Sequence, residues 1–322
     1  MIVVTGAFGF IGSSLVKALN DKGHLHDIIV VDNFYSKRKE PNLENKMIRE
    51  WIHRDIFLPW FEKSASFIDF VFHLGARTDT VDINPEIFEK LNLSYSKEIW
   101  KICTAKQVPL VYASSAATYG NGEHGFEDRH NHLDQLVPLN QYAISKNEFD
   151  KWALKQTSAP PQWAGLKFFN VYGPNEYHKS RMASVIFHAY NQIKQTGKMK
   201  LFKSHRSDVA NGHQQRDFVY VKDVVEMCDF FRNESYENGL YNIGTGKART
   251  FLDLVNATFA AMDLEPKIEF IDTPEDIRDN YQYFTEAKID KLKNAGYSQP
   301  TTSLEEGVRD YVQNYLIQHK IF

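Results

Sequence analysis

The sequence predicts an α/β protein built on a doubly wound parallel sheet, followed by a smaller C-terminal substrate-binding part. Three observations predict this fold. The first half of the 322-residue chain alternates short apolar runs with longer amphipathic runs, which is typical of a sheet covered by helices. The apolar runs are continuous, as in parallel strands buried on both faces. A glycine-rich turn joins the first apolar run to the first amphipathic run, where such sheets bind phosphates.

The predicted strands and helices of the first half alternate, except that no helix is assigned between the strands at 27–33 and 69–76. The strands are expected at residues 1–5, 27–33, 69–76, 109–115 and 163–173. The helices are expected at residues 9–23, 86–106 and 139–157.

The pattern changes after about residue 170, where the loops lengthen. Residues 203–217 form a long polar loop, 239–246 a short strand with a glycine turn, and 250–262 and 303–318 two helices. We therefore divide the chain into a dinucleotide-binding domain of Rossmann type at 1–170 and a mainly substrate-binding domain at 171–322. Segments of the second domain are expected to be able to return to the sheet.

Composition excludes several classes of protein. The hydrophobic content of 43% is enough for a large core, and the net charge of −3 argues against a nucleic-acid-binding protein. The two cysteines lie far apart and fit neither a disulfide framework nor a metal site. Residues 1–6 begin a strand, without a charged leader or an apolar run of membrane-spanning length. We expect a cytoplasmic protein with no metal and no membrane contact.

The first candidate site is the glycine loop TGAFGFIGSSL. Gly6 allows a tight turn, Gly9 allows close approach of a pyrophosphate, and Gly12 lets the helix pack against the sheet. The spacing is G-x-x-G-x-x-G rather than the commoner G-x-G-x-x-G, but the strand before it and the helix after it are both predicted. Asp32 follows Gly12 by 20 residues, at the end of the second strand, where an acid binds ribose hydroxyls.

The residues after the second strand do not decide whether the cofactor is NAD or NADP. The Asp32 carboxylate favours NAD, because it repels the extra phosphate of NADP. Asn33 follows, and the cations at 37–39 could neutralise a 2′-phosphate. A solvated basic turn is an equal alternative for that cluster.

A second candidate site combines Tyr142, Lys146 and a serine-rich strand end at 109–115. Tyr142 and Lys146 are four residues apart on a predicted helix, hence on one face. A nearby ammonium stabilises a phenolate and lowers the pKa of the tyrosine. Such a tyrosine can exchange a proton with a substrate hydroxyl while a nicotinamide takes the hydride.

These motifs show a resemblance. The chain resembles the extended short-chain dehydrogenase/reductase superfamily over nearly its full length, and within it the ADP-heptose 6-epimerase family. The resemblance rests on the segments VTGAFGFIGS, VVDN, YASSAATYG, FFNVYGPNEYHKSRMASV, RDFVYVKDV and YNIGTGKA. It implies an NADP-dependent isomerase, with NAD possible as cofactor, acting on an ADP-heptose in lipopolysaccharide inner-core synthesis. It also implies a homo-oligomer, which in this family suggests a pentamer.

The resemblance assigns cofactor contacts to the glycine loop, the second strand end, the loop after the fourth strand and the sites of chemistry. Arg54 stands where the family typically has Lys, and Arg77 where it commonly has a smaller residue. The cofactor contacts so implied are Gly6, Gly9, Phe10, Ile11, Gly12, Asp32, Asn33, Lys39, Arg54, Leu74, Gly75, Ala76, Arg77, Thr78, Asn92, Tyr142, Lys146, Val171 and Lys179.

The resemblance also assigns catalysis and substrate binding. Tyr142 and Lys179 match the two acid/base residues, and Lys146 and Ser115 assist Tyr142. His178, Lys146 and Arg181 are candidate neighbours that could lower the pKa of Lys179. The last two residues of the loop 202–205 depart from the family pattern, and Arg181 stands where the family often has Ser. The implied substrate contacts are Ser115, Asn170, Arg181, His188, Phe202, Lys203, Ser204, His205, Arg216 and Tyr281.

The implied reaction is oxidation and re-reduction at C6 of the heptose. The main rival is a hexose C4 epimerase, which has no need of Lys179. A 4,6-dehydratase would carry an Asp-Glu pair where this chain has Ala116 and Ala117. A net reductase would need cofactor exchange, which no feature demands. A non-catalytic dinucleotide sensor would typically have lost the tyrosine or the lysine.

Overall fold

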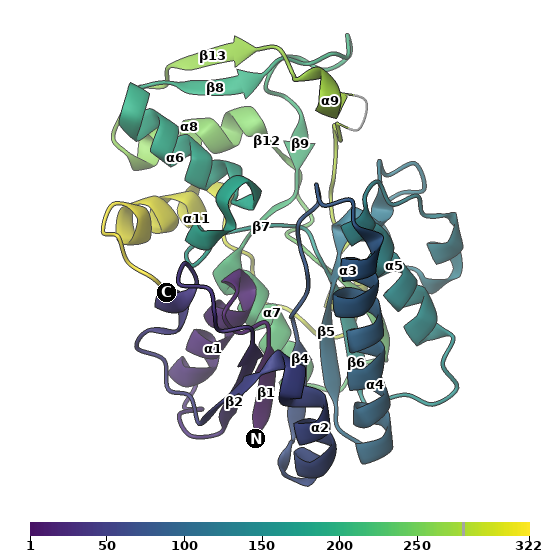
Figure 1. Cartoon of the computed structure of the whole chain (residues 1–322). Helices are drawn as coiled ribbons and strands as arrows, with labels where there is room; N and C mark the ends of the chain where they lie inside the picture. Colours follow the sequence, from purple (N-terminus) through teal and green to yellow (C-terminus); the bar gives the residue numbers. More distant parts are fainter. Residues whose placement is uncertain (279–280) are drawn as a thin grey trace.

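The structure is a computed structural model that describes residues 1–278 and 281–322. A seven-stranded sheet forms the centre of the molecule (Figure 1). All its neighbouring strands are parallel, in the order β11-β6-β5-β4-β1-β2-β3. The strands are β1 Ile2–Thr5, β2 Ile28–Asp32, β3 Glu50–His53, β4 Phe70–His73, β5 Leu110–Ser115, β6 Trp163–Phe168 and β11 Gly239–Ile243. The parallel sheet predicted from the continuous apolar runs is confirmed.

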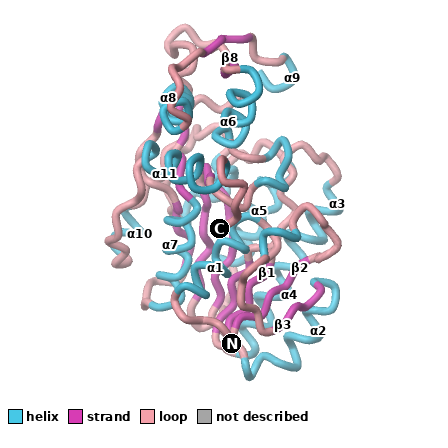
Figure 2. Tube along the Cα trace, turned by 90° about the vertical axis from the view of Figure 1, so that its left-hand side faces the viewer, coloured by secondary structure: helices cyan, strands magenta, loops and turns pink. Residues whose placement is uncertain are grey.

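Helices cover both faces of this sheet (Figure 2). On one face, α1 (Phe10–Asp21) packs against α7 (Val221–Asn233). On the other lie α2 (Arg54–Ser64), α4 (Tyr95–Lys106) and α5 (Gln141–Leu154). Alternate residues of each strand enter different cores, so that Val4 packs with the α1 side and Val3 with the α2 side. This double burial is why the strands read as continuous apolar runs.

The helix predicted at 86–106 is present as three consecutive pieces. These are α3 (Pro85–Phe88), a π-helical turn at Glu89–Ser94, and α4. Asn92 lies in the π turn and is buried. A π turn widens a helix locally and often marks a functional site.

The single strand predicted at 163–173 is wrong in its second half. The chain leaves the central sheet after β6, and Asn170–Tyr172 form β7, which pairs with β10 (Phe218–Tyr220) in a separate two-stranded sheet. Between them the Phe169 N–H still donates to Ile243 of β11, whereas the Asn170 N–H donates to Asp217. The apolar pattern does not reveal the change of partner, because β6 is fully buried and β7 still packs Val171 and Tyr172 against the core.

The rest of the chain forms a smaller lobe over the carboxyl edge of the sheet (Figure 1), with its own apolar core. The predicted strand at 239–246 and the helices at 250–262 and 303–318 are confirmed. The former is β11, which joins the central sheet, so the division at residue 170 stays a prediction. The lobe contains α6 (Val185–Thr196), β8 (Met199–Phe202), β9 (Gln215–Arg216), β12 (Arg249–Thr250), α8 (Phe251–Ala261), β13 (Ile268–Ile271), α9 (Glu275–Arg278) and α11 (Leu304–Asp310) with a π turn at Tyr311–Leu316.

A short helix, α10 (Asp290–Asn294), packs beside β11. Within residues 1–278 and 281–322, no helix has both the length and the apolar character needed to cross a bilayer.

Candidate active site

The glycine loop between β1 and α1 is a tightly folded turn. Gly6 has φ of +70°, and a Cβ on it would lie 2.6 Å from the backbone of Gly75, so only glycine fits. A Cβ on Gly12 would lie 2.2 Å from the carbonyl oxygen of Gly6. Gly12 therefore lets α1 approach the loop itself, rather than the sheet as predicted. The first turn of α1 has no side-chain cap, and its free N–H groups suit the pyrophosphate of a dinucleotide.

Asp32 lies at the carboxyl end of β2, beside this loop. Its carboxylate accepts hydrogen bonds from the backbone N–H of Phe8 at 3.0 Å and of Asn33 at 2.7 Å. In the neighbouring strand Asp32 is opposite His53, so Arg54 is the first residue beyond that edge. The predicted contacts Asp32, Asn33 and Arg54 thus come together at adjacent strand ends.

The loop after β4 closes the next side of the same edge. Leu74 and Gly75 donate backbone hydrogen bonds to Thr5, each at 3.2 Å. The side chain of Asn92 accepts from the backbone N–H of Arg77 at 2.7 Å and donates to its carbonyl at 2.9 Å. The predicted contacts at 74–78 and Asn92 therefore form one continuous wall.

The serine, tyrosine and lysine of the second motif converge at the end of β5. Asn140 caps α5 by accepting from the Ala143 N–H at 2.9 Å, which starts the helix just before Tyr142. Ser115 ends β5, and its hydroxyl lowers the pKa of Tyr142 in part. Lys146 donates to the carbonyl of Ala113 at 2.7 Å.

The ionisation of this group differs from the sequence expectation. Burial raises the pKa of Tyr142 above its ordinary value, and burial lowers the pKa of Lys146 to about 8. The expectation that the ammonium lowers the pKa of Tyr142 is not met in the chain by itself, because Lys146 donates to a backbone carbonyl and desolvation dominates both groups.

A buried ion pair lies beneath these residues and was not predicted. The Asp150 carboxylate accepts from Lys167 Nζ at 2.7 Å, Ser114 Oγ at 2.6 Å and Tyr112 OH at 3.0 Å. Lys167 also donates to Thr118 Oγ1 at 2.7 Å. The network joins α5 to β5 and β6. Its signal was in the sequence, since Asp150 continues the four-residue spacing of Tyr142 and Lys146 on one helix face.

Lys179 lies in a 3₁₀ turn at Tyr177–Met182. Its Nζ is 5.2 Å from the centre of the Phe10 ring, at the start of α1. Burial lowers the pKa of Lys179, and the buried Glu176 carboxylate opposes that shift. The cause is thus burial, and not the neighbours considered above, His178, Lys146 and Arg181.

Four further predicted substrate contacts lie together in the lobe, with two neighbours that were not predicted. The Arg216 guanidinium is 7% exposed and lies 5.8 Å from the Tyr281 ring centre and 5.5 Å from that of Phe251. Phe202 meets Tyr281 edge-on, with ring centres 6.3 Å apart. The His205 N–H donates to Tyr283 OH at 2.8 Å. Phe251 and Tyr283 were not predicted, because neither belongs to a motif.

The remaining predicted contacts are more scattered. Lys203 pairs with Asp272 at 3.1 Å, and Ser204 donates its N–H to Asn211 at 2.8 Å. Asn170 is exposed at the start of β7, next to the half-buried Val171. His188 is exposed on α6 and has no resolved link to the other site residues within the described ranges. Arg181 pairs with Asp79 at 3.1 Å.

Together these residues define a class of protein. A dinucleotide cradle, a Ser-Tyr-Lys group and a second cation, Lys179, beside the start of α1 suit hydride transfer with proton exchange at a hydroxyl-bearing carbon. No cluster of His, Cys, Asp and Glu within the described parts of the chain could hold a metal ion. A family model described as the NAD dependent epimerase/dehydratase family matches residues 2–244. The chain belongs to this family.

Individual relatives narrow the similarity. The chain is 48% identical over 326 residues to an ADP-L-glycero-D-manno-heptose-6-epimerase of Fusobacterium nucleatum subsp. nucleatum, covering 98% of each chain. It is 47% identical over 324 residues to one of Nitratidesulfovibrio vulgaris, again covering 98% of each. A solved ADP-L-glycero-D-manno-heptose-6-epimerase from Helicobacter pylori is 27% identical, with a TM-score of 0.81 over 97% of this chain and 95% of that one. The chain is similar to heptose epimerases over its whole length.

Proposed function

We propose that this chain interconverts ADP-D-glycero- and ADP-L-glycero-β-D-manno-heptose by oxidation and re-reduction at C6. The observation that carries this is the placement of two proton-handling groups. Tyr142 comes from α5 on one face of the sheet, and Lys179 lies against Phe10 of α1 on the other. Two epimers present their hydroxyl from opposite sides, so they need an acid/base group on each side of the sugar.

The residues around Tyr142 have distinct roles in this proposal. The bound nicotinamide supplies the acceptor and later the donor of the hydride at C6. Tyr142 exchanges the proton of the C6 hydroxyl in one epimer, and Ser115 hydrogen-bonds the same oxygen. Lys146, with its lowered pKa of about 8, supplies positive charge that favours the phenolate as the site fills. Lys179 exchanges the proton in the other epimer.

We propose NADP as the cofactor, with NAD as the alternative. Basic residues near the ribose end support this, because Lys39 is close enough to His178 to help lower its pKa, and Arg54 is adjacent to Asp32 across the sheet edge. Cations there can neutralise a 2′-phosphate. The cofactor would be held by Gly6, Gly9, Phe10, Ile11, Gly12, Asp32, Asn33, Lys39, Arg54, residues 74–78, Asn92 and Val171.

The nucleotide of the substrate is proposed to bind at Arg216. The guanidinium can pair with a phosphate, and the Phe202 and Tyr281 rings can stack on a base. Residues 203–205 continue this wall, and Asn170 and His188 are proposed contacts nearer the sugar. Cytoplasmic location, homo-oligomeric assembly and a place in lipopolysaccharide inner-core synthesis follow from the resemblance alone and stay predictions.

The test is turnover of one defined substrate. Purified protein incubated with ADP-D-glycero-β-D-manno-heptose should form the L-glycero epimer without added cofactor, because the hydride returns to the carbon it left. Denaturation should release a nucleotide, whose identification decides between NADP and NAD. Turnover of a UDP-hexose at C4, with none of the ADP-heptose, would replace the proposal by the rival C4 epimerase.

A further inference from the structure

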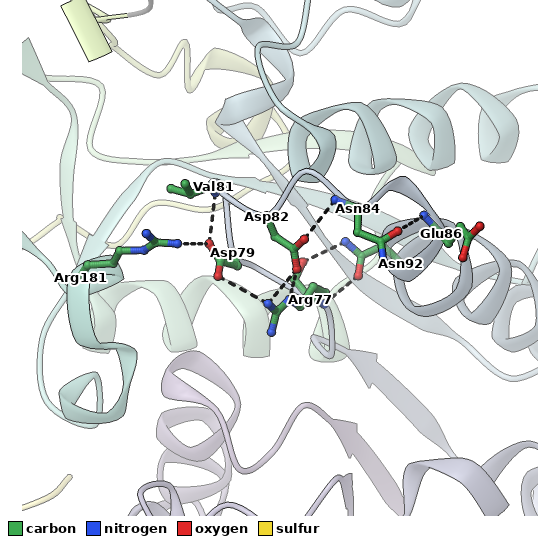
Figure 3. A network of polar contacts seen from close by, with 8 residues as sticks. All are labelled: Arg77, Asp79, Val81, Asp82, Asn84, Glu86, Asn92 and Arg181. Atoms are coloured by element: carbon green, nitrogen blue, oxygen red, sulfur yellow. Dashed lines mark hydrogen bonds and ion pairs between the residues drawn. The ribbon is translucent and has the colours of Figure 1, made fainter. Parts of the chain in front are cut away.

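A cluster of charged residues joins the loop after β4 to the turn that carries Lys179 (Figure 3). Arg181 Nη2 donates to Asp79 Oδ1 at 3.1 Å, and Asp79 Oδ2 lies 3.5 Å from Arg77 Nη2. Arg77 also donates to Asp82 at 2.8 Å. The two guanidiniums and the N–H of Val81 keep the pKa of Asp79 below its ordinary value. We refer to Arg77, Asp79 and Arg181 as the clasp.

One end of the clasp is fixed to α5, the helix that carries Tyr142. The Asn92 amide is bonded to both backbone groups of Arg77, and it also donates to Ser145 Oγ at 2.9 Å. Ser145 directly precedes Lys146 in α5. Asp79 is therefore held by a short chain of hydrogen bonds that begins on the catalytic helix.

The other end of the clasp holds an irregular turn. Arg181 is two residues after Lys179, and Ser180 between them has φ of 50° and ψ of −127°, which interrupts the helical turn. Tyr177, His178 and Lys179 are half-buried, and Tyr177 stacks on Tyr311. Ser180 and Arg181 are exposed, so packing fixes the second half of the turn only weakly. Thr80 Oγ1 adds one contact to Met182 Sδ at 3.6 Å, and Arg38 one to Ser180 Oγ at 3.5 Å.

We propose that Asp79 and Arg181 are positioning residues for Lys179. The bond between them joins the loop after β4 to the kinked turn and holds that turn so that the Lys179 ammonium stays over Phe10. This inference rests on the proposed function, in which Lys179 serves one epimer and Tyr142 the other. The clasp acts on the Lys179 side only, because Tyr142 has its own helix and buried ion pair.

The experiment compares oxidation of the two epimers in single turnover. The reduced nicotinamide formed in the holoenzyme is followed by absorbance after mixing with each epimer. Lys179→Met identifies the epimer that depends on Lys179. Arg181→Met should slow oxidation of that same epimer by about threefold to fivefold, the upper range for an ion pair whose arginine side chain is 61% exposed. The oxidation rate of the other epimer should stay within about twofold of the wild-type rate. The KM for the substrate should change little.

Three further variants make the comparison specific. Asp79→Asn should reproduce the effect of Arg181→Met, and the double variant should add little, because both remove one bond. Arg181→Lys should restore most of the rate. Lys101→Met is the matched control, since Lys101 pairs with Glu98 at 2.6 Å on α4 and its side chain is 59% exposed, close to the 61% of Arg181. It should change the oxidation rate of neither epimer. Added salt should slow oxidation of the Lys179-dependent epimer more in the wild type than in Arg181→Met.

Several results would overturn the inference. If Arg181→Met slowed the oxidation of both epimers equally, or slowed neither, the clasp would not position Lys179. A raised KM in Arg181→Met with no effect of Asp79→Asn would make Arg181 a direct substrate contact instead. If Lys179→Met abolished the oxidation of both epimers alike, the two-base scheme would be refuted. The positioning role of the clasp would be refuted with it.

Discussion

Tyr142 and Lys179 stand on supports of different kinds. Tyr142 lies in the first turn of a 14-residue helix whose inner face is tied to two strands by the buried Asp150–Lys167 pair. Lys179 lies in a six-residue 3₁₀ turn whose residues are half-buried or exposed, with a left-handed kink at Ser180. The difference shows that one active site can combine a group fixed by core packing with one fixed by a few polar contacts at the surface.

The largest expected effects come from removing the two groups themselves. Tyr142→Phe and Lys179→Met should each slow epimerisation by about 10²–10⁴-fold, the usual range for a lost general acid or base. Both should keep the cofactor bound, as measured by the nucleotide released on denaturation. If both sides matter equally, the two losses are similar. Near-normal activity of Lys179→Met would leave a single-base mechanism at Tyr142.

Lys167→Met tests whether the buried Asp150–Lys167 pair stabilises the structure around Tyr142. It leaves the Asp150 charge buried without its cation, which should lower the free energy of unfolding by about 3–5 kcal/mol. Chemical denaturation measures the loss. The control is Lys101→Met, whose ammonium pairs with Glu98 at 2.6 Å on the exposed face of α4 and which should cost no more than about 1 kcal/mol. Equal losses in the two variants would mean that the buried pair does not stabilise the Tyr142 side.

The smallest expected effect concerns His178 and acid. His178 accepts a hydrogen bond from Asn42 Nδ2 at 3.2 Å, and burial, with help from Lys39 and Lys179, lowers its pKa to about 4. The unfolded chain takes up this proton near the ordinary pKa of about 6.5, whereas the folded chain does not. The stabilisation is therefore complete above pH 6.5 and is lost as the pH falls towards 4.

His178→Gln should accordingly reduce the pH dependence of unfolding between those values by about one proton. Denaturant titrations at several pH values measure it. His124→Gln, at an exposed position in the polar loop, is the control and should leave the dependence unchanged. An unchanged slope in His178→Gln would show that His178 is protonated in the folded chain.

Much of the structure around Tyr142 could be predicted from the sequence. Continuous apolar runs indicated a parallel sheet, and the spacing of Tyr142 and Lys146 indicated a shared helix face, because both patterns are local. The break at Phe169 was missed, since a strand that changes partner keeps its apolar pattern. Asp79 and Arg181 were also missed as a pair, because they are 102 residues apart and only the fold brings two loops together.

The sequence by itself determined the class of sheet, the glycine loop and the residues of the Ser-Tyr-Lys motif. These depend on periodicity and on backbone conformations that few residues can adopt. Only the tertiary structure decided what holds Lys179, why burial dominates the pKa of Tyr142 and Lys146, and which strand receives residues 239–243. Those outcomes depend on desolvation and on contacts between distant segments, and neither is encoded in local spacing.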